Sequence, residues 1–207
     1  MSTELMNLLP NLKKPSSRLR EASLCSIKKY LYSYKLGYKE QITCLSILSS
    51  NNYLFWKIDE GQNDESVGRS FSALTICLIL ENDKDSLIDT NLLIDEISKY
   101  IKKENDFRGQ SLELGWIHCW AHLGDLISFL GYHENSSHEK LKTLLITLVD
   151  RLSKVKEVKF SNEEEERLAY GVNLILKKLD FKKEFMEYVE TLTQSNLLTS
   201  VVRALSF

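Results

Sequence analysis

Apolar residues recur at spacings of three and four along nearly the whole chain, which is the pattern of amphipathic α-helices. The polar segment at residues 59–66 is the clearest interruption, and Pro10 and Gly37 mark two other breaks. Ser136 followed by Glu139 forms a capping box at the start of one helix. The pattern predicts about ten helices, over residues 3–9, 17–37, 39–48, 68–80, 89–103, 112–130, 136–152, 163–179, 181–192 and 195–205.

The predicted helices alternate between longer and shorter ones. The longer ones begin near residues 17, 67, 112 and 162, so the unit repeats about every 45 to 50 residues, as it does in helical-hairpin solenoids. We therefore predict an all-α fold of stacked antiparallel helical hairpins, a HEAT- or armadillo-like α–α superhelix, with a compact orthogonal bundle as the alternative. Because no linker is evident, we expect a single helical domain over residues 1–207, with a short N-terminal extension over 1–16.

The composition favours the same fold class. Only 2 prolines and 8 glycines occur among 207 residues, which are too few turn residues for a β-sandwich or a doubly wound α/β fold. Hydrophobic residues make up 43% of the chain and charged residues 27%, which is ordinary for a globular domain that buries a core. Long helices therefore account for both the pattern and the composition.

Net charge and apolar run length argue against two classes of function. A formal charge of −2 disfavours a dedicated nucleic-acid binder, because phosphate contacts need a basic face. The longest apolar run, around Leu78–Leu80, is far too short to span a membrane, and no signal-peptide pattern is evident, so we expect a cytoplasmic protein. The cysteines lack metal or redox spacing and are expected to be buried, reduced thiols, at Cys25, Cys44, Cys77 and Cys119.

The most unusual segment is the predicted helix at residues 114–130, which is apolar nearly all round. On a helical projection Trp116 falls on one face of it. His118, His122 and Asp125 fall on the opposite face, at the spacing i, i+4, i+7. Polar groups inside a fold need a partner or a cavity, so this polar strip is the first candidate for a functional site.

Three interpretations of the polar strip are open. The first is a satisfied structural network, in which each imidazole bonds a neighbour and Asp125 pairs with an arginine. The second is a ligand-binding strip on the inner, concave face of the solenoid. The third is a divalent metal site, for zinc for example, held by His118, His122 and Asp125. Cys119 stands where a His-Glu-x-x-His protease carries its glutamate, which argues against zinc-protease chemistry.

Three arginines lie near predicted helix starts, at Arg69, Arg108 and Arg167. The helix dipole opposes a cation there, so a local anion must compensate each of them. Asp125 is a candidate partner for Arg69. The anion is either an internal carboxylate or a phosphate or carboxylate ligand, because the arginine fork suits both.

Three sequence blocks stand out together, and they are Arg69–Leu74, Arg108–Gly109 with Gly115–Asp125, and Glu166–Tyr170. In order and spacing, from about Ser17 to the end of the chain, they resemble a family of bacterial proteins catalogued as domain of unknown function 2785. The resemblance implies a helical-repeat fold, and it implies no particular activity.

Two functional hypotheses follow from these residues. The first is a non-catalytic binding or adaptor protein without a cofactor, which holds a protein or a small anionic ligand on its concave face. The alternative is a metal-dependent hydrolase, in which His118, His122 and Asp125 hold a divalent metal with water in an open position. The candidate ligand-binding residues are Arg69, Trp116, His118, His122, Asp125 and Arg167.

Overall fold

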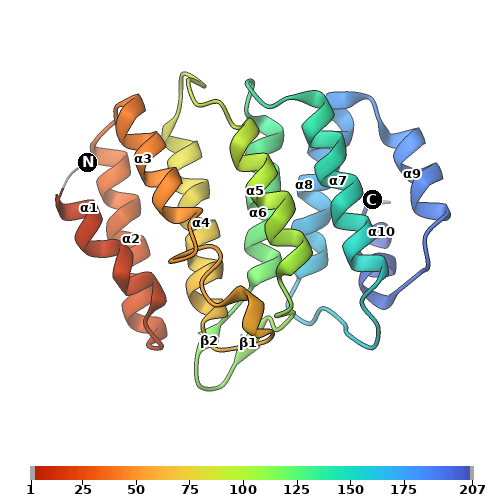
Figure 1. The fold of residues 1–207 in the computed structure, drawn as a ribbon, viewed down its shortest axis with the longest axis horizontal. Helices are drawn as coiled ribbons and strands as arrows, with labels where there is room; N and C mark the ends of the chain where they lie inside the picture. Colours follow the sequence, from red (N-terminus) through yellow and green to blue (C-terminus); the bar gives the residue numbers. More distant parts are fainter. Residues whose placement is uncertain (1–2, 206–207) are drawn as a thin grey trace.

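The computed structural model describes residues 3–205, and within them the chain is almost wholly helical (Figure 1). The all-α prediction is confirmed, and the described part of the chain contains ten α-helices. The helices are α1 Thr3–Leu8, α2 Ser17–Ser33, α3 Tyr38–Leu48, α4 Ser66–Asn82, α5 Asn91–Lys103, α6 Cys119–Tyr132, α7 His138–Ser153, α8 Glu164–Leu179, α9 Lys182–Glu190 and α10 Asn196–Ala204. Two 3-10 turns, η1 Leu9–Lys13 and η2 Ile58–Glu60, and a hairpin of β1 Gln110–Ser111 and β2 Gly115–Trp116 complete the elements.

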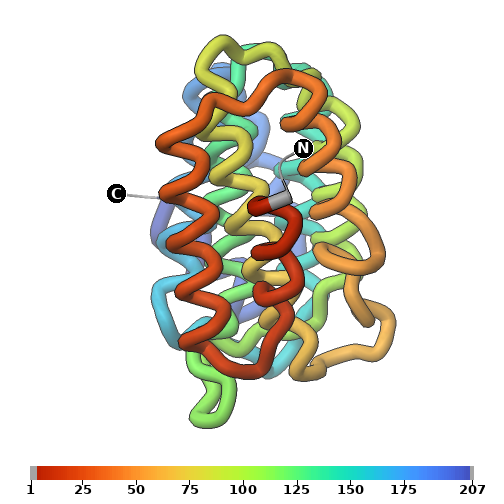
Figure 2. Tube along the Cα trace, turned by 90° about the vertical axis from the view of Figure 1, so that its left-hand side faces the viewer, coloured from red at the N-terminus to blue at the C-terminus, as the bar shows by residue number. Residues whose placement is uncertain are grey.

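The helices form two layers. Helices α2, α4, α6 and α8 pack side by side in one layer, and α10 packs against α8. Helices α3, α5 and α7 lie in front of that layer in Figure 1, and the end-on view of Figure 2 shows the two layers in profile. The helices run side by side and do not cross at right angles, so an orthogonal bundle is not the architecture that forms. A HEAT- or armadillo-like superhelical twist stays a prediction.

The N-terminal residues cover one end of the stack. Helix α1 and turn η1 pack against α2, and Figure 2 shows α1 lying across the end of both layers. Their leucines Leu5, Leu9 and Leu12 are buried in the hydrophobic core. Pro10 stands at the start of η1, where its missing N–H costs no hydrogen bond. The segment therefore contributes to the core as well as preceding the first long helix.

Helix α6 is the centre of its layer. It contacts α4 on one side and α8 on the other, and nearly all of its residues are buried. Its apolar side chains, such as Trp120, Leu126 and Leu130, belong to the core that runs through the described chain. Burial on both sides explains why the sequence of this helix is apolar nearly all round.

Glycines let α6 and α8 approach closely. A Cβ added at Gly124 would lie 2.5 Å from the carbonyl carbon of Arg167 and 2.6 Å from the amide nitrogen of Leu168. On the other helix, a Cβ added at Gly171 would lie 2.7 Å from the carbonyl oxygen of Gly124. These contacts are backbone against backbone, so only glycine fits unless the two helices separate.

The predicted helix at residues 112–130 is wrong at its start. Helix α6 begins at Cys119, and the residues before it form the β1–β2 hairpin. Gly115 and His118 both have positive φ angles, 70° and 51°, which cannot continue a right-handed helix. Trp116 and His118 therefore do not lie on a helix, and the i, i+4, i+7 face expected for the polar strip does not exist.

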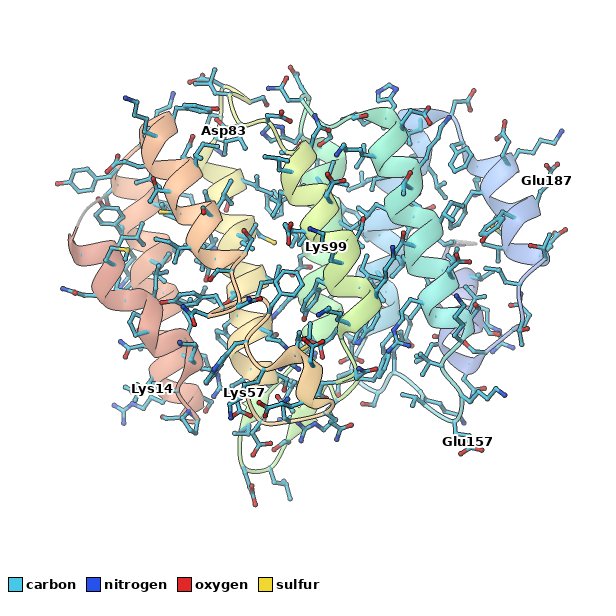
Figure 3. All side chains as sticks on the ribbon, viewed as in Figure 1. Lys14, Lys57, Asp83, Lys99, Glu157 and Glu187 are labelled. Atoms are coloured by element: carbon cyan, nitrogen blue, oxygen red, sulfur yellow. The ribbon has the colours of Figure 1, made fainter. Side chains whose placement is uncertain are left out.

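Charged side chains project from the outside of both layers, as the labelled Lys14, Lys57 and Glu187 do (Figure 3). Three of the four cysteines are buried as expected, but Cys25 is exposed on α2, and that expectation was wrong for this residue. Among residues 3–205, no helix combines the length and the apolar character needed to cross a membrane.

We expect Gly124→Ala to destabilise the fold by about 2 kcal/mol, because the new methyl group meets backbone atoms of α8 that cannot move without parting the helices. The matched control is Gly131→Ala on the same helix. There the new Cβ would lie 2.9 Å from the side-chain atom Cγ1 of Ile175, and the nearest backbone atom, the Ile175 nitrogen, is 3.7 Å away, so the loss in the free energy of unfolding should be smaller. Urea denaturation of both variants measures this difference, and equal losses would contradict the backbone contact.

Candidate functional site

The β1–β2 hairpin presents Trp116 and His118 at the N-terminal end of α6. Gln110 pairs with Trp116, and the carbonyl oxygen of Gly109 accepts hydrogen bonds from the amides of Ile117, at 2.9 Å, and His118, at 3.2 Å. The Trp116 and His118 rings stack, with centroids 4.6 Å apart and planes 12° from parallel. Trp116 remains 43% exposed, so the hairpin holds an indole in place at the surface.

A buried arginine of α2 ties the hairpin to the fold. Arg20 donates to the carbonyl oxygens of Lys14, at 2.8 Å, and Pro15, at 2.6 Å, and also to the carbonyl oxygen of Leu114 in the hairpin. Its guanidinium lies 5.1 Å from the centroid of the Phe71 ring. Burial lowers the pKa of Arg20. Within residues 3–205 no carboxylate is in ion-pair distance of it, so hydrogen bonds to carbonyl oxygens hold this charge.

Glu164, at the first position of α8, holds His118. Its Oε1 lies 2.9 Å from His118 Nδ1, and its Oε2 accepts the amides of Ser161, at 3.1 Å, and Asn162, at 2.9 Å. Burial alone would raise the pKa of Glu164, but the hydrogen bonds from His118 and the two amides outweigh burial and lower it. The Glu164 carboxylate therefore stays ionised and holds the His118 ring in place. The backbone of His118 is in the left-handed region, with a φ of 51°.

His122 lies behind His118, one turn into α6. Its Nδ1 is 2.7 Å from Oγ of Ser70 and 3.2 Å from the Ser70 carbonyl oxygen, and its ring meets Phe71 edge to face at 5.9 Å. Burial, with the nearby positive charge of Arg167, lowers the pKa of His122 to about 3. The imidazole is therefore neutral at physiological pH, and its ring centroid lies 5.9 Å from that of His118.

Asp125 and Arg167 form an ion pair across α6 and α8. The guanidinium grips the carboxylate with two nitrogens, Nε at 3.0 Å from Oδ1 and Nη2 against Oδ2. Both side chains are about one-third exposed, at 28% for Asp125 and 33% for Arg167. The pair is near His122, because the positive charge of Arg167 helps to lower the pKa of that imidazole. We call the five residues together the histidine surface, and they are Trp116, His118, His122, Asp125 and Arg167.

Arg69 is not part of the histidine surface. It is fully buried and pairs with Glu104 through two contacts, Nε to Oε2 at 2.7 Å and Nη2 to Oε1 at 2.9 Å. Tyr100 also donates its hydroxyl to Glu104, at 2.8 Å. Asp125, the candidate partner for Arg69, is therefore not its partner. Although burial opposes it, the contact with Glu104 raises the pKa of Arg69, so this arginine is a structural cation closed off from solvent.

Each of the three arginines at helix starts or their preceding loops has an internal carboxylate partner. Arg69 pairs with Glu104, Arg167 with Asp125, and Arg108 with the buried Asp106 at 2.7 Å. A compensating anion was expected for each of them, and in every case a side chain of the chain itself supplies it. Arg167 alone combines such a pair with a place on the histidine surface.

The geometry does not gather a metal-ligand set. Among the described residues no group of three or more His, Cys, Asp or Glu side chains is placed to hold a metal ion. Nδ1 of His118 is bonded to Glu164, Nδ1 of His122 to Ser70, and Asp125 to Arg167. Each of the three candidate metal ligands, His118, His122 and Asp125, thus already has a hydrogen-bond partner in the protein.

Sequence reasoning missed the residues that hold the site in place. Neither Glu164 nor Glu104 was singled out, because Glu164 lies in a run of acids at residues 163–166 and Glu104 directly follows the predicted helix 89–103. Arg20 carried no signal, because an arginine in an amphipathic helix normally lies at the surface. Their partners lie 35 to 94 residues away in sequence, so no local pattern reveals them.

The fold and this surface define a two-layered all-α protein with a Trp116–His118 stack and a partly exposed arginine–carboxylate pair. The sequence model of the family described as "Protein of unknown function (DUF2785)" matches residues 54–203, and the chain belongs to that family. The match takes in the hairpin and every residue of the histidine surface, whereas α1, α2 and α3 precede it. No curated protein and no solved structure matches the chain.

We expect Glu104→Gln to lower the free energy of unfolding by about 3 kcal/mol, because it leaves the buried Arg69 charge without its carboxylate. The matched control is Glu96→Gln, which removes a carboxylate from an exposed pair with Lys99 and should change stability by less than about 1 kcal/mol. Chemical denaturation of both variants tests this. Similar small losses would show that the buried pair is not needed for the fold.

We expect His122 to make stability fall as the pH drops below its ordinary pKa of about 6.5. The unfolded chain then takes up a proton that the folded imidazole, with its pKa of about 3, does not. His122→Asn should remove a loss of about 2 kcal/mol between pH 7.5 and pH 5. Urea denaturation at the two pH values measures it, with His138→Asn at the exposed His138 as the control that retains the wild-type loss.

Proposed function

We propose that the chain is a non-catalytic binding protein that holds a carboxylate-bearing ligand, either a protein segment or a small molecule, at the histidine surface. The observation that carries the proposal is the placement of the Trp116–His118 stack. The indole is 43% exposed, and His118, on which it stacks, adopts a φ of 51°. A non-glycine residue in that conformation costs free energy, and such strain gathers at functional sites.

The supports of the stack favour a preorganised site. Arg20 fixes the hairpin from α2, and Glu164 fixes the His118 ring from α8. Both residues are buried, with Arg20 0% and Glu164 1% exposed. A recognition group held by buried partners loses little conformational entropy when a ligand binds, which favours affinity.

The unengaged polar atoms favour an acceptor ligand. The Asp125 carboxylate is saturated by Arg167, and the Glu164 carboxylate by His118 and two amides. Within residues 3–205, by contrast, Nη1 of Arg167 and Nε1 of Trp116 have no hydrogen-bond partner. Both atoms are donors only, and a carboxylate accepts a charge-assisted hydrogen bond from a single guanidinium nitrogen.

An NMR titration tests the proposal, with the indole Nε1–H signal of Trp116 as the reporter. Citrate serves as a small polycarboxylate and poly-glutamate as a polypeptide probe. We expect one of them to shift the Trp116 signal and to leave that of Trp120 in place, since Trp116 is 43% exposed and Trp120 is buried. The probe that shifts the Trp116 signal shows whether the bound carboxylate belongs to a small molecule or to a polypeptide.

The variants decide whether the histidine surface is responsible. Arg167→Gln should weaken the response about tenfold, because a charge-assisted hydrogen bond is lost. Arg203→Gln removes an exposed arginine of α10 and should change nothing. A Trp116 signal that neither probe moves, or a response that survives Arg167→Gln, would refute the proposal.

A further inference from the structure

Each of the two histidines of the histidine surface keeps one ring nitrogen free. His118 uses its Nδ1 to contact Glu164, at 2.9 Å. His122 uses its Nδ1 to contact Ser70, at 3.2 Å from the carbonyl oxygen and 2.7 Å from Oγ. Within residues 3–205 neither Nε2 atom has a hydrogen-bond partner, and neither is sealed from solvent. Two polar atoms of this surface are thus open to a ligand.

The partners of the two Nδ1 atoms decide what the Nε2 atoms can do. The Glu164 carboxylate and the Ser70 carbonyl oxygen can only accept hydrogen bonds, so Nδ1 carries the hydrogen in both rings. In a neutral imidazole with its hydrogen on Nδ1, Nε2 is an acceptor. His122 is neutral at physiological pH, because burial lowers its pKa to about 3. The free nitrogens therefore favour a ligand that donates hydrogen bonds.

The two rings are close enough to share one donor group. Their centroids are 5.9 Å apart, and their planes are tilted by 57°. A donor at about 3 Å from both Nε2 atoms can bridge rings at this separation. An ammonium group has three N–H bonds, so it can donate to both rings at once.

The same surface carries free donors beside these acceptors. Nη1 of Arg167 and Nε1 of Trp116 have no partner within residues 3–205. The Trp116 ring stacks on that of His118, with centroids 4.6 Å apart, and the charge of Arg167 is close enough to His122 to lower its pKa. Donors for a carboxylate and acceptors for an ammonium are therefore neighbours. An α-amino acid joins those two groups through a single carbon atom.

The charges that support the surface are balanced. Arg167 pairs with Asp125, the buried Glu164 carboxylate is ionised, and Arg20 is a buried cation beneath the hairpin. With neutral imidazoles, these two cations and two carboxylates carry no net charge. A ligand whose own charges balance leaves this neutrality unchanged, which favours a zwitterion over a bare carboxylate or a bare amine.

We propose that the ligand of the histidine surface is a free α-amino acid. Its carboxylate accepts from Arg167 and Trp116, and its ammonium donates to Nε2 of His118 and His122. This inference rests on the proposed function, because it names the chemical class of the carboxylate-bearing ligand.

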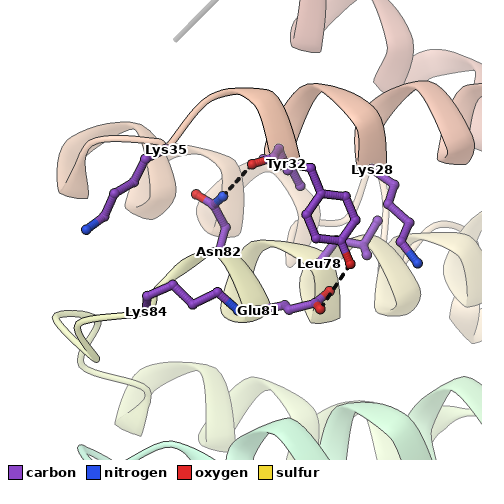
Figure 4. Close-up of a pocket in the computed structure, with 8 residues that line it drawn as sticks. Lys28, Tyr32, Lys35, Leu78, Glu81, Asn82 and Lys84 are labelled. Carbon is purple, nitrogen blue, oxygen red and sulfur yellow. Dashed lines mark hydrogen bonds between the residues drawn. The ribbon is translucent and has the colours of Figure 1, made fainter.

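A groove between α2 and α4 also brings charges of both signs together, and it provides a check on where the amino acid binds (Figure 4). Its volume is about 200 Å³, and its charged lining residues are Lys28, Lys35, Glu81 and Lys84. Asn82 lies in this groove and donates its Nδ2 to the carbonyl oxygen of Leu31, at 2.8 Å. The groove shares no residue with the histidine surface, so the side-chain amide signal of Asn82 reports a ligand in the groove alone.

Glutamate and glutarate are the matched probes, because they share a carbon chain and two carboxylates and differ by the amino group. In NMR titrations of the full chain, both should shift the indole signal of Trp116. Glutamate should bind about tenfold more tightly, because only its ammonium forms charge-assisted hydrogen bonds with the histidines.

One variant tests the acceptor. His122→Phe keeps an aromatic ring against Phe71 and removes Nε2. It should weaken glutamate binding about tenfold and leave glutarate binding unchanged. His138→Gln, at the exposed His138 of α7, should change neither. Thermal melting verifies that both variants fold, and the two probes on the wild-type chain test the inference without any variant.

The outcomes separate this inference from the proposed function. Equal shifts of Trp116 by glutamate and glutarate, at equal affinities, would overturn the inference and leave the proposed function in place. A Trp116 signal that neither compound moves would contradict both. Shifts of the Asn82 amide in place of Trp116 would assign the amino acid to the groove. A preference for glutamate that survives His122→Phe would show that the histidine does not accept its ammonium.

Discussion

The close contact of α6 and α8 sets the geometry of the histidine surface. Gly124 touches the backbone of Arg167, and the next residue on α6 is Asp125, which pairs with the side chain of that same arginine. One turn earlier on α8, Glu164 reaches His118. If the helices lay farther apart by the width of a methyl group, both contacts would lengthen. A packing constraint in the core therefore decides the placement of polar groups on the surface.

Two buried glutamates, one just after α5 and one at the first position of α8, each accept hydrogen bonds from loop amides. Glu104, just after α5, accepts the amides of Asn105 and Asp106 as well as the guanidinium of Arg69. Glu164 accepts two loop amides and contacts a histidine in the same manner. Each carboxylate replaces lost hydration with several donors, which is the condition for burying a charge. The loops on either side of the hairpin are thus fixed by charges and not by apolar packing alone.

Periodicity in the sequence was enough to predict the all-α class and most helix positions, because burial of one helix face dominates those segments. It failed at residues 112–118, where apolar residues happen to continue the helical spacing while Gly115 and His118 adopt positive φ. The histidines, Asp125 and Arg167 were found as candidates from their residue types. Their partners were not found. Asp125 was a candidate partner for Arg69, whereas the carboxylate that pairs with Arg69 is Glu104, which reaches it only through the tertiary fold.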